Sequence, residues 1–183
     1  MKNNNNDENE PSVHWEDVTN DGSLENFART LDLRSESLQF EDGVLILPQN
    51  KILHESSDNQ NLFPGTTKDV MMTLKEGGVP VHLYEDGRSR RELVLKSADI
   101  ILPIVMFLSD PAVAIGLNLI SNWIYDRWIM TKTKNPPSMR VEYVEIKDKK
   151  SVLRWRRVEG PAEDVRNLLI EEARLRKENQ IKQ

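Results

Sequence analysis

The apolar side chains of this chain concentrate in residues 98–130, and their pattern breaks at an acid-proline pair. Between Ile100 and Leu117 the only charged residue is Asp110. This run is nearly long enough to cross a bilayer, but a carboxylate at mid-membrane costs about 2.5 to 3.5 kcal/mol, and Pro111 removes a backbone donor. The pattern therefore favours a hairpin of two shorter helices, with Asp110 capping the second.

The second predicted helix of this hairpin has an apolar side and a polar side. Its apolar residues recur every three or four positions, at Val113, Leu117, Ile120, Ile124 and Trp128. Its polar residues are Asn118, Ser121, Asn122 and Asp126. In a soluble fold the polar side would meet water or a neighbouring backbone, whereas in a bilayer it would line a lumen or a helix contact. We expect a buried hairpin and keep membrane insertion as the alternative.

Residues 13–97 predict an α/β region that follows a disordered, asparagine-rich tail at residues 1–12. Capping residues and apolar spacing predict helices from Ser23 to Thr30 and from Thr67 to Glu76. The buried run Val44 to Leu47 follows an Asp-Gly pair, which is typical of a hairpin or of the start of a strand. We expect this run to be parallel to VPVHLY (residues 79–84) through a crossover, and VPVHLY to pair antiparallel with ELVLK (residues 92–96).

The C-terminal part predicts a β-β-α module at residues 139–183, after a basic, proline-rich linker at 131–138. Arginines flank Trp155 on the second strand, and we expect them to pair with Glu142 and Glu145 across the hairpin rather than with nucleic acid. The predicted fold class is α+β: a small mixed sheet, a central hydrophobic helical hairpin at 98–130 and the β-β-α module.

Composition narrows the chemistry more than it identifies a partner. The chain has 183 residues, 38% of them apolar and 30% charged, with a formal charge of -5, so we expect one ordinary domain. It has no cysteine, which excludes disulfides, thiolate metal sites and cysteine nucleophiles. The N-terminus has no apolar signal region, and we expect a cytoplasmic protein that reaches a membrane only if residues 98–130 do so.

The sequence contains none of the common catalytic or phosphate-binding motifs. Gly65 stands alone before Thr66 and Thr67, without the Gly-Lys of a phosphate loop, and the three histidines are far apart. We therefore predict no catalytic residue, no metal site and no cofactor. An alternative is a small α/β enzyme or ligand-binding domain that uses residues 49–67 and His82, and that interpretation requires a deep pocket beside His82.

Two groups of residues are candidate binding sites. Arg88, Arg90 and Arg91 follow an Asp-Gly turn and form either a solvated tip or a site for a phosphate, a lipid headgroup or an acidic partner. The second group lies on the hydrophobic helix and comprises Asn118, Asn122, Trp123, Asp126 and Trp128. Its amides and Asp126 could line a contact or a lumen, and its tryptophans are typical of an interfacial anchor.

The order of elements from Ala98 onward resembles the effector-associated constant component proteins of bacterial conflict systems. The residues that carry the resemblance are ISNWIYDR, MRVEYVEI, SVLRWRRV and EDVRNLLIEEA. The resemblance implies a small noncatalytic adaptor that accompanies an effector in bacterial anti-phage defence. We therefore expect a protein partner, with a membrane surface or a second copy of the chain as alternatives and nucleic acid disfavoured. A membrane-perturbing effector is the second functional hypothesis.

Overall fold

A computed structural model describes residues 14–17, 22–50, 60–93, 100–108, 110–130, 137–147 and 151–181. The predicted tail at 1–12 and most of the predicted linker lie outside the described residues. The strands are β1 (His14–Asp17), β2 (Val44–Leu47), β3 (Gln60–Pro64), β4 (Val81–Leu83), β5 (Ser89–Leu93), β6 (Ile100–Ile101), β7 (Ile104–Phe107), β8 (Ser138–Lys147) and β9 (Ser151–Pro161). The helices are α1 (Leu24–Thr30), the 3-10 helix η1 (Ser35–Leu38), α2 (Thr67–Glu76), α3 (Asp110–Ile124), the π-helical η2 (Tyr125–Ile129) and α4 (Ala162–Ile181).

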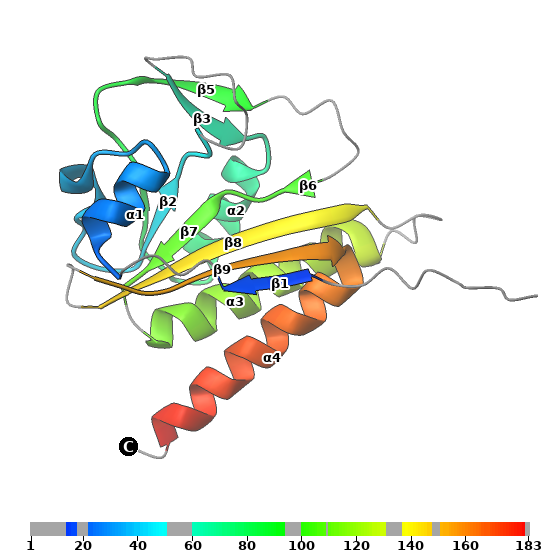
Figure 1. Cartoon of the computed structure of the whole chain (residues 1–183). Helices are drawn as coiled ribbons and strands as arrows, with labels where there is room; N and C mark the ends of the chain where they lie inside the picture. Colours follow the sequence, from blue (N-terminus) through cyan, green and yellow to red (C-terminus); the bar gives the residue numbers. More distant parts are fainter. Residues whose placement is uncertain are drawn as a thin grey trace, which may run out of the picture.

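A mixed sheet organises the fold, in the order β1-β9-β8-β7-β2-β4, with the short β6 also paired to β8 (Figure 1). Strands β7 and β8 are parallel, as are β2 and β4, and the other neighbours in this order are antiparallel. A second, smaller sheet consists of β3 and β5 in parallel. The predicted α+β class, with its mixed sheet and its C-terminal β-β-α module, is confirmed.

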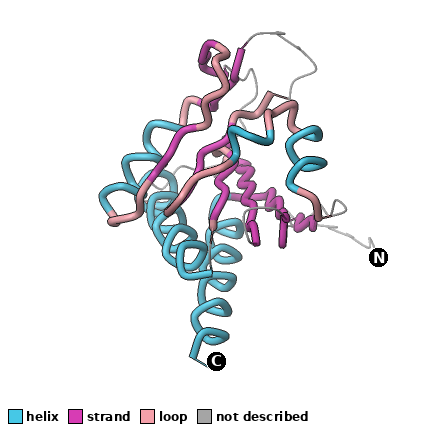
Figure 2. The backbone as a smooth tube through the Cα atoms, turned by 90° about the vertical axis from the view of Figure 1, so that its left-hand side faces the viewer, coloured by secondary structure: helices cyan, strands magenta, loops and turns pink. Residues whose placement is uncertain are grey.

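Helices cover both faces of the large sheet (Figure 2). On one face α3 packs against α4 and α2. The contact of α3 with the sheet is close, because a Cβ atom added at Gly116 would lie 2.4 Å from the ring of Phe107. On the other face, Phe27 of α1 meets Trp155 of β9 edge-to-face, with ring centroids 5.2 Å apart. The two faces therefore offer different surroundings to residues that alternate along the same strand.

The prediction of a helix for the first arm of the hairpin is wrong. Residues 100–101 and 104–107 form β6 and β7 instead of a helix, and only the second arm, α3, is helical. Strand β7 lies between β2 and β8 in a sheet that is covered on both faces, and all four of its residues are buried. A continuous apolar run of this length is typical of a strand buried on both faces, and periodicity alone does not distinguish it from a buried helix.

The predictions for the N-terminal region are confirmed in part. Helix α2 has the predicted bounds, α1 begins one residue after the predicted start at Ser23, which is its N-cap, and β2 and β4 are parallel as expected. The N-cap of α2 is Thr66, the residue before the predicted start. The predicted antiparallel pair is wrong, because β4 pairs with β2 in the large sheet whereas β5 pairs with β3. The intervening residues 84–88 thus connect two different sheets.

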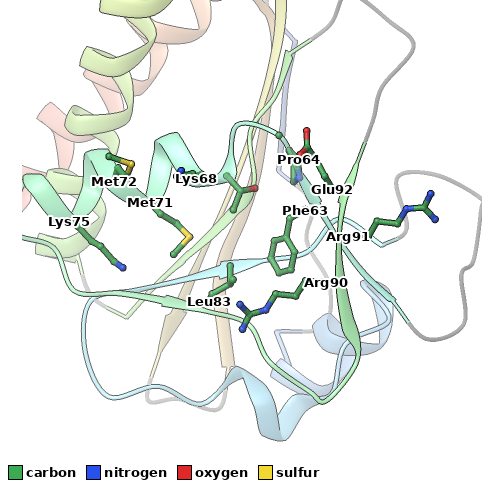
Figure 3. Close-up of a pocket in the computed structure, with 12 residues that line it drawn as sticks. Phe63, Pro64, Lys68, Met71, Met72, Lys75, Leu83, Arg90, Arg91 and Glu92 are labelled. Carbon is green, nitrogen blue, oxygen red and sulfur yellow. The ribbon is translucent and has the colours of Figure 1, made fainter.

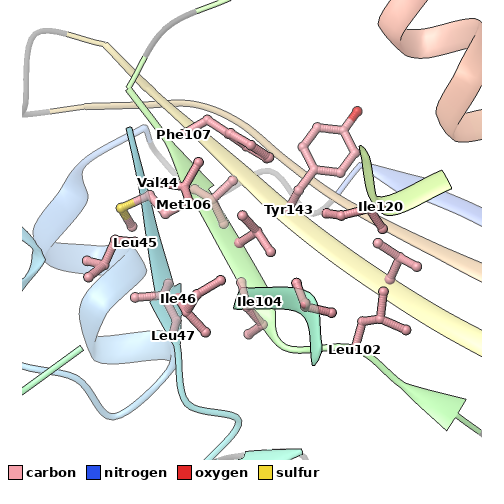
Figure 4. Close-up of a cluster of buried hydrophobic side chains, with 14 of the residues drawn as sticks. Val44, Leu45, Ile46, Leu47, Leu102, Ile104, Met106, Phe107, Ile120 and Tyr143 are labelled. Carbon is pink, nitrogen blue, oxygen red and sulfur yellow. The ribbon is translucent and has the colours of Figure 1, made fainter. Parts of the chain in front are cut away.

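The core lies where β2, β7 and β8 meet α3 (Figure 4). Every residue of β2 and β7 is buried, and Leu117 and Ile120 of α3 are at most 1% exposed. Residues 101–107 and the inward side of α3 are therefore packed into the protein interior, whereas Ile115, Tyr125 and Met130 of the same apolar stretch are exposed. Among the helices of the described residues, none combines the length and the apolar character needed to cross a membrane.

Buried charges attach α4 to the β8-β9 hairpin. Arg176 of α4 donates to both carboxylate oxygens of Glu145 on β8, at 2.6 and 2.9 Å, and also to Glu172. Glu172 pairs in turn with Arg154 and Arg156 of β9. The expected cross-strand pairing is present at Glu142, which accepts from Arg157 at 3.0 Å. Glu145 accepts from Arg176 of α4, and its register partner on β9, Arg154, pairs with Glu172 of the same helix.

Candidate functional site

An open groove of about 420 Å³ lies between α2 and the small sheet (Figure 3). Strand β4 contributes Leu83 to it, so the groove spans the junction between the two sheets. Its lining residues are Phe63, Pro64, Gly65, Thr67, Lys68, Met71, Met72, Lys75, Leu83, Arg90, Arg91 and Glu92. We call this surface the methionine groove.

Helix α2 forms one wall because its two faces differ in character. Val70 and Leu74 are at most 1% exposed and hold the helix to the core. The opposite face presents Lys68, Met71, Met72 and Lys75. Each methionine is three or four residues from each lysine, the spacing that places side chains next to one another on a helix. Met72 is 49% exposed, which is high for an apolar side chain. The result is an apolar strip between two lysines.

Strand β5 forms the other wall. Side chains alternate across a strand, so Arg90 and Glu92 lie on one side, and Arg91 and Leu93 on the other. In Figure 3 the Arg90 side chain extends toward Leu83, whereas that of Arg91 points away from the groove. Arg90 also forms an ion pair with Glu85, near the groove entrance. Of the predicted arginines, Arg90 is therefore the one that faces the groove.

The groove has an excess of positive charge. Four of its lining residues are basic, and Glu92 is the single acidic one. Within the described part of the chain, Lys68, Lys75 and Arg91 form no ion pair. Phe63, Met71 and Leu83 line the same groove, so apolar side chains and the cations of Lys68, Lys75 and Arg90 occur together there.

Arg88, the third predicted arginine, is used inside the fold. Its guanidinium donates to Asp86 at 2.6 Å and to the side chain and carbonyl of Asp32 at 3.1 and 2.6 Å. Burial raises the pKa of the Asp86 carboxyl, but hydrogen bonds from Arg88, Asn61 and Tyr84 outweigh it and hold this pKa below its ordinary value. Arg88 thus links the segment between the sheets to the end of α1, and its side chain is only 15% exposed.

The second predicted group lies on α3 and η2, away from the groove. Trp123 and Trp128 are half-buried and meet edge-to-face, with centroids 4.7 Å apart. Asn118 is half-buried, and Asn122 and Asp126 are exposed. These residues and the arginines of β5 are therefore on separate parts of the molecule and do not form one site.

His82 lines neither the methionine groove nor the other cavity found among the described residues. It is exposed on β4, where its Nε2 lies 3.1 Å from a carboxylate oxygen of Asp42, and its neighbour Leu83 lines the groove instead. The described residues contain no group of three histidine, aspartate or glutamate side chains able to hold a metal ion. His54 lies outside the described residues, as does the side chain of His14.

Sequence reasoning identified the arginines but missed the apolar residues of the groove, namely Phe63, Met71, Met72 and Leu83. One signal was available, because Met71 and Met72 continue the apolar character of α2 beyond the face that Val70 and Leu74 need. The proximity of β3, β4 and α2 depends on tertiary structure. No protein-family model, curated protein or solved structure matches this chain.

Proposed function

We propose that this chain is a noncatalytic interaction component, and that it binds an acidic segment of a partner protein in the methionine groove. The observation that carries the proposal is the apolar floor of the groove beside basic side chains: Met72 is exposed, Met71 and Leu83 are half-buried, and Phe63 is 7% exposed. A segment with apolar residues among glutamates or aspartates would complement both features.

The physical contributions of floor and rim differ. Burying one apolar side chain is worth about 1.5 to 3 kcal/mol, and methionine adapts its shape to varied partners. Charge complementarity adds mainly to the rate and specificity of association and is weakened by salt. The proposal therefore requires binding that depends on an apolar anchor and on ionic strength together.

The alternative function, a membrane-perturbing effector, requires a large rearrangement of this fold. Insertion of residues 98–130 would have to remove β7 from between β2 and β8, although every β7 side chain is buried there. The groove needs no such rearrangement. A role beside an effector in bacterial defence is what the family resemblance implies, and it would make the effector the source of the acidic segment.

The test uses a short fluorescein-labelled peptide that carries two leucines among glutamates, and a matched peptide with lysines in place of the glutamates. We expect fluorescence polarisation to show saturable binding of the acidic peptide, weakened at higher salt. Lys68→Glu combined with Lys75→Glu should weaken it by about tenfold or more. Met72→Glu should also weaken it, and its exposed helical position makes misfolding a poor explanation.

Lys177→Glu is the matched control, because Lys177 is exposed on α4 and does not line the groove. It makes the same change of charge as each of the two groove substitutions taken singly, and should leave the affinity unaltered. Equal binding of the acidic and basic peptides, or unchanged affinity in the groove variants, would contradict the proposal.

A further inference from the structure

A second cavity, of about 280 Å³, lies on the face of the large sheet that carries α1. The end of α1 and the hairpin β8-β9 form most of its walls, and the residues following β2 close it. Its lining residues are Thr30, Leu31, Gln49, Ile104, Arg140, Glu142, Trp155 and Arg157. None of them lines the methionine groove. We call it the α1-face cavity.

The cavity has a buried acceptor without a partner. Gln49 is 0% exposed, and its Nε2 donates to the carbonyl oxygen of Leu102 at 2.5 Å. Because that carbonyl can only accept, the amide orientation is determined and Oε1 must point elsewhere. Oε1 is buried and has no hydrogen-bond partner among the described residues. Leaving such an acceptor unsatisfied is costly, so a native fold normally supplies a donor.

A buried donor belongs to the same cavity. The Nε of Arg140 makes no hydrogen bond within the described part of the chain, although it lies 3.4 Å from Glu142 and 3.5 Å from Glu159. Glu142 is 1% exposed and already accepts from the Trp155 indole at 3.2 Å and from Arg157 at 3.0 Å. The cavity therefore presents an acceptor, a donor and a carboxylate that is already compensated.

We propose that the α1-face cavity binds a small planar heterocycle that has a ring N–H next to a carbonyl, the cyclic amide edge of a nucleobase-type ligand. The N–H would donate to Gln49 Oε1, and the carbonyl would accept from Arg140. Leu31, Ile104 and Trp155 supply apolar walls, and Trp155 is held in place by its edge-to-face contact with Phe27. The volume lies just below the roughly 300 to 1,000 Å³ of sites for larger ligands and suits one ring system.

The test compares uracil with 1,3-dimethyluracil, whose ring N–H groups are blocked, by following backbone amide shifts of the full chain. We expect saturable shifts at Gln49, Ile104 and Arg140 with uracil up to roughly 10 mM, as a fragment of this size requires. Dimethyluracil should bind about tenfold more weakly or worse, because it leaves Gln49 without a donor. This comparison uses the unaltered protein and does not depend on a variant that folds.

Arg140→Met and Gln49→Met should each weaken the binding of uracil by about tenfold. Arg91→Met, on the small sheet, should leave the affinity for uracil unchanged. Absence of saturable shifts would mean that the cavity holds water only and would overturn the proposal. Equal affinity for the two probes, or shifts confined to the methionine groove, would overturn it as well.

Discussion

Two arginines on α4 allow the value of a buried ion pair to be measured against an exposed one in the same helix. Arg176 has a side chain that is 9% exposed, and its partners Glu145 and Glu172 are 2% and 8% exposed. Arg174, two positions earlier, is 53% exposed and pairs with Glu171 and Glu178. Both arginines thus have two glutamate partners and differ chiefly in their access to water.

Arg176→Met keeps most of the aliphatic stem and removes the hydrogen bonds from the guanidinium to Glu145 and Glu172. Glu172 retains Arg154 and Arg156, whereas Glu145 loses its bidentate partner while buried. Removing one partner of a buried pair typically costs about 3 to 5 kcal/mol. We expect the free energy of unfolding to fall by that amount, measured by urea denaturation with circular dichroism.

Arg174→Met is the control and should leave the urea midpoint nearly unchanged, because solvent screens exposed pairs. Adding Glu145→Leu to Arg176→Met should restore part of the lost stability, since the buried carboxylate that lost its bidentate guanidinium is then replaced by an apolar side chain. Similar midpoint shifts for the two single variants would refute the reasoning. A double variant less stable than Arg176→Met alone would refute it too.

Two further stability changes follow from the fold. Asp86→Asn should cost about 1 to 3 kcal/mol at pH 7. The pKa of Asp86 is lowered in the folded protein, so its contribution to the free energy of unfolding is fully present above its unfolded pKa of 3.8. That contribution is lost as the pH falls through the folded pKa. The urea midpoints of the variant and the unaltered protein should therefore converge in acid. Gly43→Ala should lower the urea midpoint more than Gly87→Ala does. Both glycines have positive φ, so the backbone strain of the two variants is similar. However, a Cβ at Gly43 would lie 2.0 Å from the Pro80 carbonyl oxygen, whereas a Cβ at Gly87 would have no atom within 4 Å. Equal losses of stability in the two glycine variants would contradict this prediction, because they would show that backbone strain, and not the clash with Pro80, sets the cost.

The elements that sequence reasoning placed correctly are those with local signals. Helix α1 begins after the Ser23 cap, whose hydroxyl accepts from the Asn26 amide at 3.1 Å, and α2 ends at Glu76, directly before Gly77 and Gly78. The β8-β9 hairpin alternates in the expected way, with Glu142 opposite Arg157. Caps, turns and period are set by residues only a few positions apart, so a single sequence contains them.

The candidate sites were predictable only in part, because they depend on contacts between residues that are far apart in the sequence. The sequence shows three arginines together, but their different environments arise from contacts far along the chain. Arg88 reaches Asp32, Arg90 faces the groove beside Leu83, and Arg91 points away from it. Gln49 gave no signal at all, because its orphan oxygen exists only where the β2 end, Leu102 and the β8-β9 hairpin converge.

By itself, the amino-acid sequence determined the α+β class, the β-β-α end and the position of α3, through capping residues and hydrophobic periodicity. Tertiary structure decided whether residues 100–107 became helix or strand, because a short apolar run adopts the conformation its neighbours can pair with, and here β2 and β8 lie on either side of it. It also decided which charges are buried and where the two cavities open, since burial depends on elements that are distant in sequence and adjacent in space.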